Sequence, residues 1–167
     1  MFSGFIKTFG KREAVSLEKE AASSQRKRKN FNLHRLPDSV QRFLNCMFSF
    51  SYVRPHRHVL PPKTETFVLL RGRVWVFVFD DQGSIIDAVL MDGKEVSVVD
   101  ISPGCWHTLL PVKKSLLFEV KPGPYDPQTD KEFAPWAPEE DAPETRKTMK
   151  EWLITGKRIP KTHKNNR

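Results

Sequence analysis

The stretch VRPHRHVLPPKTETFVLLRG, residues 53–72, decides the fold of this chain. It places two histidines, His56 and His58, one residue apart, and Glu65 follows after a short Pro-Pro loop. Because side chains alternate between the two faces of a β-strand, both histidines are expected to point the same way. A carboxylate on the returning strand adds a third ligand to the two imidazoles. These residues predict a metal site built on two neighbouring strands.

The fourth candidate ligand is His107, in the segment SPGCWHTLLP. We expect it to come from a later strand, across the sheet from the other three. Imidazole and carboxylate ligands suit iron, manganese, zinc, nickel or cobalt. We therefore predict one divalent transition metal per chain, with the open position that a catalytic site keeps. The alternative for an isolated His-x-His pair is a solvated or structural role.

The pattern between Phe48 and Lys121 is that of an all-β protein. Apolar segments recur roughly every ten residues and are separated by turn signals such as Asp92-Gly93. Short strands without helices between them predict a β-sandwich or a β-barrel. A C-terminal helix is expected over residues 145–156, TRKTMKEWLITG, with Gly156 as its stop.

The segment before the strands is expected to be helical as well. Asp38 and Ser39 are good N-cap residues for a short helix, SVQRFLNCM, over residues 39–47. Residues 10–29 are charged and short of apolar anchors, so they are expected to be a frayed helix or disordered.

The positive charge of the chain belongs to its two ends. The formal net charge is +8, and residues 1–29 and 157–167 each contribute +5, which leaves −2 for the middle. We expect a basic, flexible segment at 1–29, a barrel domain at 30–141, and a helix with a basic tail at 142–167. Residues 1–25 and 157–167 are expected to be dispensable for folding.

Several classes of protein are disfavoured by the composition. The two cysteines imply no disulfide framework, and no apolar run has the length of a signal peptide or a membrane span. The cytoplasm is the expected location. No specific nucleic-acid partner is expected, because the middle of the chain is slightly acidic and lacks aromatic interleaving. Barrel edges and exposed aromatic residues are compatible with a homodimer.

The spacing of the four metal candidates is similar to the two-motif signature of the cupin superfamily. The segments RPHRH, KTETF, GRVWVFVFDDQGSI, WHTLLP, FEVKPGPY and FAPWAPEE resemble the WbuC-type cupin-fold metalloproteins, over about residues 26–141. The resemblance implies a small cupin (jelly-roll) β-barrel, a setting in bacterial surface-polysaccharide (O-antigen) metabolism, and a metal bound by His56, His58, Glu65 and His107. Here Pro111 stands where the general second motif has an asparagine.

Strand parity suggests which side chains surround the metal. Arg54 shares the face of the two histidines and Lys63 shares that of Glu65, so both are candidates to bind an anionic ligand. The alternative is that both extend into solvent. Glu119 in an apolar strand and Tyr125 in GPY are candidates for catalysis, although the strand-end position of Glu119 is also compatible with exposure.

Two classes of function fit this reading. The first is a metalloenzyme acting on a small anionic or sugar-related substrate, as an isomerase or epimerase, or as an oxygenase. The second is a non-catalytic, metal-dependent module that binds such a molecule. The reaction is open at this point, because one scaffold supports many activities.

Overall fold

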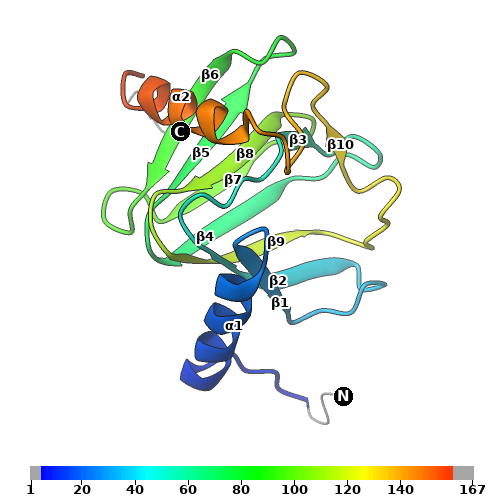
Figure 1. Cartoon of the computed structure of the whole chain (residues 1–167). Coiled ribbons are helices and arrows are strands. Elements are labelled where there is room, and N and C mark those ends of the chain that lie inside the picture. Colours follow the sequence, from blue (N-terminus) through cyan, green and yellow to red (C-terminus); the bar gives the residue numbers. More distant parts are fainter. Residues whose placement is uncertain (1–4, 160–167) are drawn as a thin grey trace.

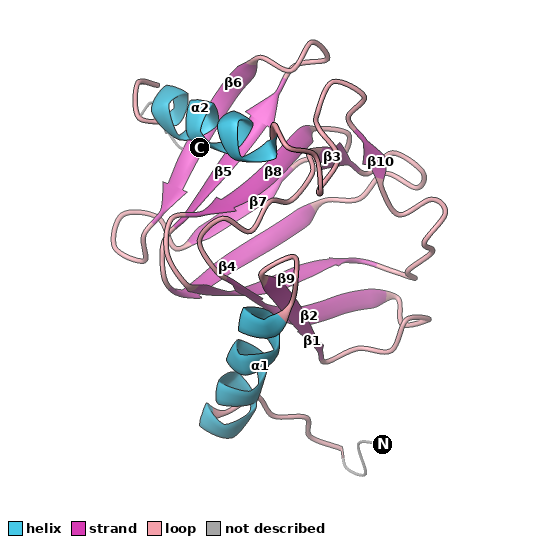
Figure 2. Cartoon of the chain, viewed as in Figure 1, coloured by secondary structure: helices cyan, strands magenta, loops and turns pink. Residues whose placement is uncertain are grey.

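The computed structural model describes residues 5–159, which form two five-stranded sheets packed face to face with a helix outside each (Figures 1 and 2). The first sheet has the order β1-β2-β9-β4-β7 and the second has the order β10-β3-β8-β5-β6. The elements are α1 (Lys11–Ser23), β1 (Arg28–Asn32), β2 (Val40–Met47), β3 (His56–Arg57), β4 (Glu65–Arg71), β5 (Val74–Phe79), β6 (Ile85–Met91), β7 (Val98–Ile101), β8 (Trp106–Pro111), β9 (Ser115–Pro122), β10 (Glu132–Phe133) and α2 (Thr145–Gly156). The expected small β-barrel with flanking helices is confirmed.

The core lies partly between the sheets and partly beneath α2. In β5, Val74 and Val76 face the space between the sheets, whereas Trp75 and Phe77 face α2. Both faces of this strand are buried, which explains its unbroken apolar sequence. Gly156, at the end of α2, lies so close to β5 that an added Cβ would stand 2.6 Å from the Phe77 ring.

The tight connection between β4 and β5 depends on Gly72. Its φ is +109°, and an added Cβ would lie 2.2 Å from Oγ of Ser115. Only glycine avoids both the backbone strain and this clash. The chain therefore turns back sharply after β4 and begins the second sheet directly.

Helix α1 covers the outer face of the first sheet near β1 and β2 (Figure 1). Its buried residues Leu17 and Ala21 pack against Leu44, Cys46 and Leu116. Of the two alternatives for residues 10–29, the structure has the helix, and it is packed against the sheet. Residues 11–23 therefore form part of the packed structure, and whether residues 1–25 are dispensable for folding stays a prediction. Most of the other expected tail, residues 160–167, lies outside the described residues.

The short helix predicted over residues 39–47 is wrong, because this segment is strand β2. Val40, Phe43, Leu44 and Met47 have helical spacing, but the strand buries both of its faces. Leu44 and Cys46 face α1, and the alternate residues Gln41, Phe43, Asn45 and Met47 face the space between the sheets. A strand covered on both sides lacks the polar-apolar alternation that would have identified it.

Residues 126–144, here called the strap, connect β9 to α2. In Figure 1 the strap runs along the right-hand side of the molecule, past β10, and returns to α2. Its Trp136 packs against Phe79 and Trp106, as expected of an aromatic residue that must cover a surface. Phe133 lies 48% exposed near the ring of His56. The strap therefore borders the place where the metal candidates meet.

Candidate metal centre

The four predicted metal ligands come together between the sheets. His56 is in β3, His58 follows directly, His107 is in β8, and Glu65 begins β4. Their nearest ligand atoms all lie within 4.8 Å of one another, and each residue is only 1–2% exposed. The fold thus brings together the His-x-His pair, the glutamate and the distant histidine in a single cluster.

The expected arrangement of these ligands over the strands needs a correction. His107 does not come from across the sheet, because β3 pairs with β8 and His56 is the register partner of His107. Glu65 is the ligand that reaches over from the opposite sheet. The chain crosses between the sheets in the loop after His58, so β3 and β4 are consecutive in sequence without being paired.

Backbone carbonyls fix the orientation of all three imidazoles. Nδ1 of His56 lies 3.0 Å from the carbonyl oxygen of Arg54, and Nδ1 of His107 lies 2.9 Å from that of Cys105. Nδ1 of His58 contacts the carbonyl oxygen of Asp130. A carbonyl oxygen can only accept a hydrogen bond, so each Nδ1 carries the proton and each Nε2 presents a lone pair. This is how proteins orient histidines that bind metals.

The inward-facing atoms of the cluster need a cation or a proton between them. Nε2 of His58 lies 3.0 Å from Oε1 of Glu65, and Nε2 of His107 lies 2.9 Å from Oε2. The Nε2 atoms of His56 and His58 and the Oε1 of Glu65 are buried and have no hydrogen-bond partner among residues 5–159. Lone pairs that face each other at such distances repel, and an unpaired buried polar atom is costly. Three nitrogens and one carboxylate therefore fit a divalent transition metal.

Burial and nearby charges set the protonation of these ligands. Burial holds the pKa of His56 well below its ordinary value, so the ring stays neutral. Burial alone would raise the pKa of Glu65, but Lys121, and the imidazoles of His107 and His58 when their Nε2 atoms carry a proton in place of a metal, hold it well below its ordinary value. A neutral imidazole and an ionised carboxylate are the forms that bind a metal.

A buried ionic network supports Glu65 from behind. Nζ of Lys121 lies 3.2 Å from Oε1 of Glu65 and 2.9 Å from Oδ2 of Asp130. The other oxygen of Asp130 accepts a hydrogen bond from Nζ of Lys63 at 2.8 Å. Although burial opposes it, these two lysines lower the pKa of Asp130, and the surrounding carboxylates raise the pKa of Lys121. Every member of the network is therefore charged and paired.

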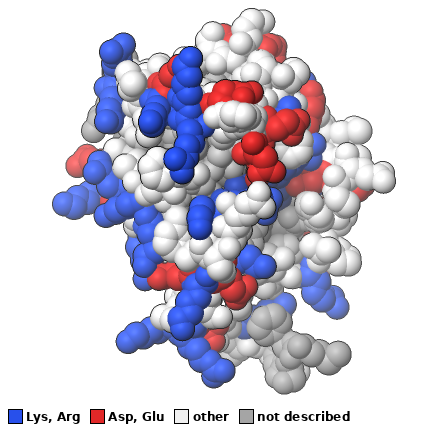
Figure 3. Space-filling model, in the orientation of Figure 1, with Lys and Arg blue, Asp and Glu red and all other residues white. Residues whose placement is uncertain are grey.

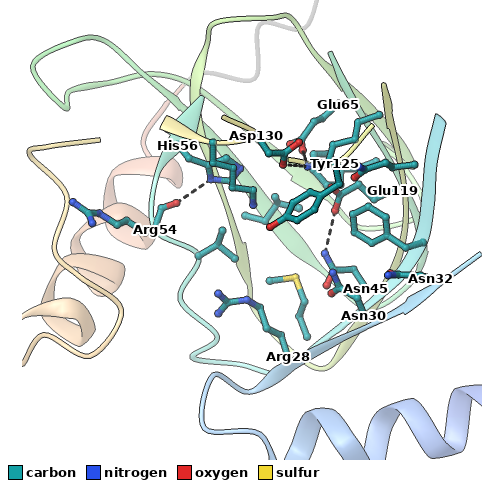
Figure 4. A pocket seen from close by; sticks show the side chains of 18 of the residues that line it. Arg28, Asn30, Asn32, Asn45, Arg54, His56, Glu65, Glu119, Tyr125 and Asp130 are labelled. Atoms are coloured by element: carbon teal, nitrogen blue, oxygen red, sulfur yellow. Dashed lines mark hydrogen bonds and ion pairs between the residues drawn. The ribbon is translucent and has the colours of Figure 1, made fainter. Parts of the chain in front are cut away.

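A cavity of about 360 Å³ opens beside the metal cluster (Figure 4). His56 and Glu65 form part of its wall, and Phe67, Leu109 and Met47 supply apolar surface. The rest of the lining is unusually polar for the space between two sheets. Its polar and charged members, beyond the two metal candidates, are Arg26, Arg28, Asn30, Asn32, His34, Gln41, Asn45, Arg54, Glu119, Lys121, Tyr125, Asp130, Lys131 and Glu140.

The two predicted cationic residues differ in their positions. Arg54 lines the cavity, but Figure 4 shows its guanidinium extending away from the interior. There its Nη1 lies 2.6 Å from Oε1 of Glu139, and its Nη2 donates to the carbonyl oxygen of Ala134. Lys63 is buried behind Asp130 and is not among the residues that line the cavity. Neither Lys63 nor Arg54 extends freely into solvent.

Both candidates for catalysis line the cavity. Glu119 is 6% exposed and accepts a hydrogen bond from Nδ2 of Asn45 at 3.2 Å. Burial and the negative charge of Glu65 raise the pKa of Glu119 to about 8. Tyr125 is 39% exposed, and Figure 4 shows its ring reaching over the cavity. Glu119 is thus buried, although it lies near the end of its strand, whereas Tyr125 is partly exposed.

Several lining residues were not predicted from the sequence. Gln41 and Asn45 were hidden by the helical interpretation of β2, although together with Phe43 they stand at every second residue, which is the spacing of a strand face. Lys121 shares the face of Glu119 in β9 by the same parity, so a signal was present. Asp130 and Lys131 lie in the strap, where no periodicity indicates which side chains point inward.

Comparison with known proteins connects this geometry to a fold. Residues 11–91 match the family model described as Domain of unknown function (DUF6016). That range includes three of the four metal candidates and ends before His107. No curated protein matches the sequence.

Solved structures share the architecture at low sequence identity. CapF, a capsular polysaccharide assembling protein from Staphylococcus aureus, is 22% identical over 62% of this chain, with a TM-score of 0.53, and the match spans 28% of CapF. Oxalate oxidase, in complex with the substrate analogue glycolate, is 14% identical over 68% of this chain and 58% of its own, with a TM-score of 0.51.

The fold is of the cupin type, a mainly β sandwich of two sheets with a helix near each end of the chain. Within the described residues, no helix is long and apolar enough to cross a membrane.

Proposed function

We propose that this protein binds one divalent transition metal through His56, His58, Glu65 and His107 and uses it to act on a small anionic or sugar-related molecule. One observation carries the proposal. The Nδ1 atoms of all three imidazoles are engaged by backbone carbonyls, while the opposite nitrogens converge on a buried carboxylate. A packed core gains nothing from such an arrangement, but a metal site requires it.

The residues of this chain have separate roles in the proposed site. A bound metal would polarise a carbonyl or bind dioxygen. Lys121 and Asp130 keep Glu65 ionised and oriented, and burial among Phe67 and Leu109 limits the access of water. Glu119 lies in the cavity beside Glu65, where it can exchange a proton with a ligand. These roles suit an isomerase-like, epimerase-like or oxygenase-like metalloenzyme.

The setting in surface-polysaccharide metabolism has its own support. The sequence resembles WbuC-type proteins over residues 26–141, and that narrower assignment remains a prediction. CapF is described as assembling capsular polysaccharide, and this chain shares the fold of a part of CapF that spans 28% of its length. A polar cavity beside the metal suits a sugar-derived ligand. The alternative function is a metal-dependent binding module without catalysis, in the same fold and with the same ligands.

Elemental analysis tests the proposal directly. Freshly purified protein is expected to contain close to one metal per chain, and the double variant His56→Ala/His58→Ala is expected to contain none. His34→Ala is the matched control, because His34 is a buried histidine of the cavity that lies outside the cluster. Stoichiometric metal in the double variant would refute the assignment.

Catalysis and simple binding can then be separated on the metal-loaded protein. Incorporation of solvent deuterium into an activated sugar, followed by NMR, would identify an isomerase or epimerase. Metal-dependent uptake of dioxygen would identify an oxygenase. Binding with neither signal would favour the non-catalytic module.

A further inference from the structure

The charges that line the cavity do not balance once a metal is bound. Five cationic residues face four acidic ones, and the acidic residues are Glu65, Glu119, Asp130 and Glu140. The lining is thus close to neutral, and a divalent ion makes it clearly positive. A cavity with low-dielectric walls and positive charge attracts an anion. This step rests on the proposed metal site.

Arg28 is the cation best placed to bind an anion at the end of the cavity away from the metal cluster, whereas Lys131 lies near that cluster, beside His56 and Glu65. Lys121 is engaged by Glu65 and Asp130, and the guanidinium of Arg54 extends away from the interior. Figure 4 shows Arg28 at the end of the cavity away from Glu65 and Asp130. Its side chain is 11% exposed, and its Nη1 donates to the carbonyl oxygen of Tyr52 at 2.7 Å. That hydrogen bond fixes the position of the guanidinium.

The present partner of Arg28 is a carboxylate that another anion can replace. Nη2 of Arg28 donates to Oε1 of Glu140, which belongs to the strap. Glu140 is also 4.0 Å from Nε of Arg26, so it keeps a cationic neighbour when it leaves Arg28. A carboxylate or phosphate from a ligand presents the same acceptor geometry to the guanidinium.

Four amide side chains of the cavity lining form what is here called the amide wall. They are Asn30 and Asn32 of β1 and Gln41 and Asn45 of β2, and Figure 4 shows the three asparagines on the same side of the cavity. Nε2 of Gln41 and Oδ1 of Asn45 are buried and have no hydrogen-bond partner among the described residues. Buried amide groups without partners are rare in folded proteins. One free donor and one free acceptor match the hydroxyl groups of a ligand.

We propose that Arg28 binds the anionic group of a polyhydroxylated ligand, exchanging Glu140 for the ligand's carboxylate or phosphate, while the amide wall binds its hydroxyl groups. Such a ligand places an oxygen at the metal, hydroxyls along β1 and β2, and its charge at Arg28. The chemical class is a sugar acid or a sugar phosphate.

Calorimetric titration of the metal-loaded protein tests this assignment. The probes are D-glucuronate, D-glucose 6-phosphate and neutral D-glucose, with acetate and inorganic phosphate as anions that lack the hydroxyls. At least one anionic hexose is expected to bind more tightly than glucose by about ten- to a hundredfold, because a charge-assisted hydrogen bond contributes that much. Comparison of the two anionic hexoses shows whether carboxylate or phosphate is preferred.

Variants distinguish ligand binding from a role in anchoring the strap. Arg28→Gln is expected to lose that preference while its affinity for glucose is unchanged, and Glu140→Gln is expected to tighten anion binding. Arg57→Gln is the matched control, because Arg57 also pairs with a strap carboxylate, Glu132, but lies outside the cavity lining. Its affinities should equal those of the wild type.

Two results would overturn the inference. Unchanged anion affinity in Arg28→Gln, together with a lowered melting temperature, would make Arg28 a strap anchor only. If neither anionic hexose bound at millimolar concentration, the proposal that the ligand is a sugar acid or a sugar phosphate would be refuted. Metal analysis of each sample keeps the two proposals apart, since a full metal complement with either result leaves the proposed metal site intact.

Discussion

Asp130 joins the strap to the metal cluster through three separate contacts. Its carbonyl oxygen accepts from His58, and its two carboxylate oxygens bind Lys63 and Lys121. Lys121 in turn contacts Glu65. A single residue outside the ligand set thus orients one imidazole and positions the charge beside the carboxylate ligand. Such outer partners commonly determine how tightly a metal is held.

Asp130→Asn is expected to destabilise the protein and weaken its metal site. Removal of one partner from a buried ionic network leaves uncompensated charge and costs about 3–5 kcal/mol. Metal affinity should fall about 10–100-fold, as for other partners of metal ligands. Chemical denaturation and competition with a chelator measure the two effects.

Asp141→Asn provides the control for this change. Asp141 is exposed, and its one contact, with Nε2 of Gln25, can also be made by an asparagine. Its stability should stay within about 0.5 kcal/mol of the wild type. If both variants behaved alike, the ionic network would have no structural role.

The residues of the candidate metal cluster could be predicted from the sequence, but much of their surroundings could not. His56, His58, Glu65 and His107 are residue types that bind metals, at a spacing that strand parity can interpret. The burial of Lys63 against Asp130 could not be predicted, because parity gives the face of a residue and not what covers that face. Asp130 lies in an irregular segment, where side-chain direction depends on tertiary contacts alone.

At the scale of elements, β2 shows where pattern reading fails. Its sequence VQRFLNCM fits a helix because apolar residues face both α1 and the cavity, and polar Gln41 and Asn45 lie on the inner face. The buried face of a strand is usually apolar, but a strand that lines a polar cavity carries polar side chains on that face. The C-terminal helix was predictable over residues 145–156, because its apolar positions pack on one sheet. Gly156 is its last residue but does not have the left-handed φ of a glycine stop, and it instead allows close packing against Phe77.

The packing of α1 predicts the effect of a substitution there. Leu17 is 2% exposed and contacts the outer face of β2 and β9, so Leu17→Ala should cost about 2–5 kcal/mol. Val15 in the same helix is 46% exposed, and Val15→Ala should have little effect. Thermal unfolding of both variants is the measurement. Equal melting temperatures would show that α1 does not contribute to the stability of the barrel.

At the scale of the whole molecule, surface charge and cavity charge are distinct. Figure 3 shows Lys and Arg side chains gathered mainly on the left of the face drawn, with acidic side chains toward the upper right. The cavity has its own mixture of charges, in which buried lysines and carboxylates alternate. The net charge of +8 therefore describes the exterior and gives no information about the ligand.

The metal cluster bridges the two sheets, so metal removal should affect the entire fold. Three ligands come from the sheet that contains β3 and β8, and Glu65 comes from the opposite sheet. A metal that binds this arrangement and not the unfolded chain would stabilise the fold by about 2.7 kcal/mol when free metal is about 100 times its Kd. Without metal, the inward-facing lone pairs are left unpaired between the sheets.

Chelation is therefore expected to lower the melting temperature by about 5–10 °C, since 1 kcal/mol shifts a domain of this size by about 2–4 °C. Addition of the metal found by elemental analysis should restore it. The variant His56→Ala/His58→Ala should melt at one temperature with or without chelator, because it has no site to empty. The contrary result would be a wild-type protein that contains metal, loses it to the chelator, and keeps the same melting temperature. The metal would then bind somewhere other than between the two sheets.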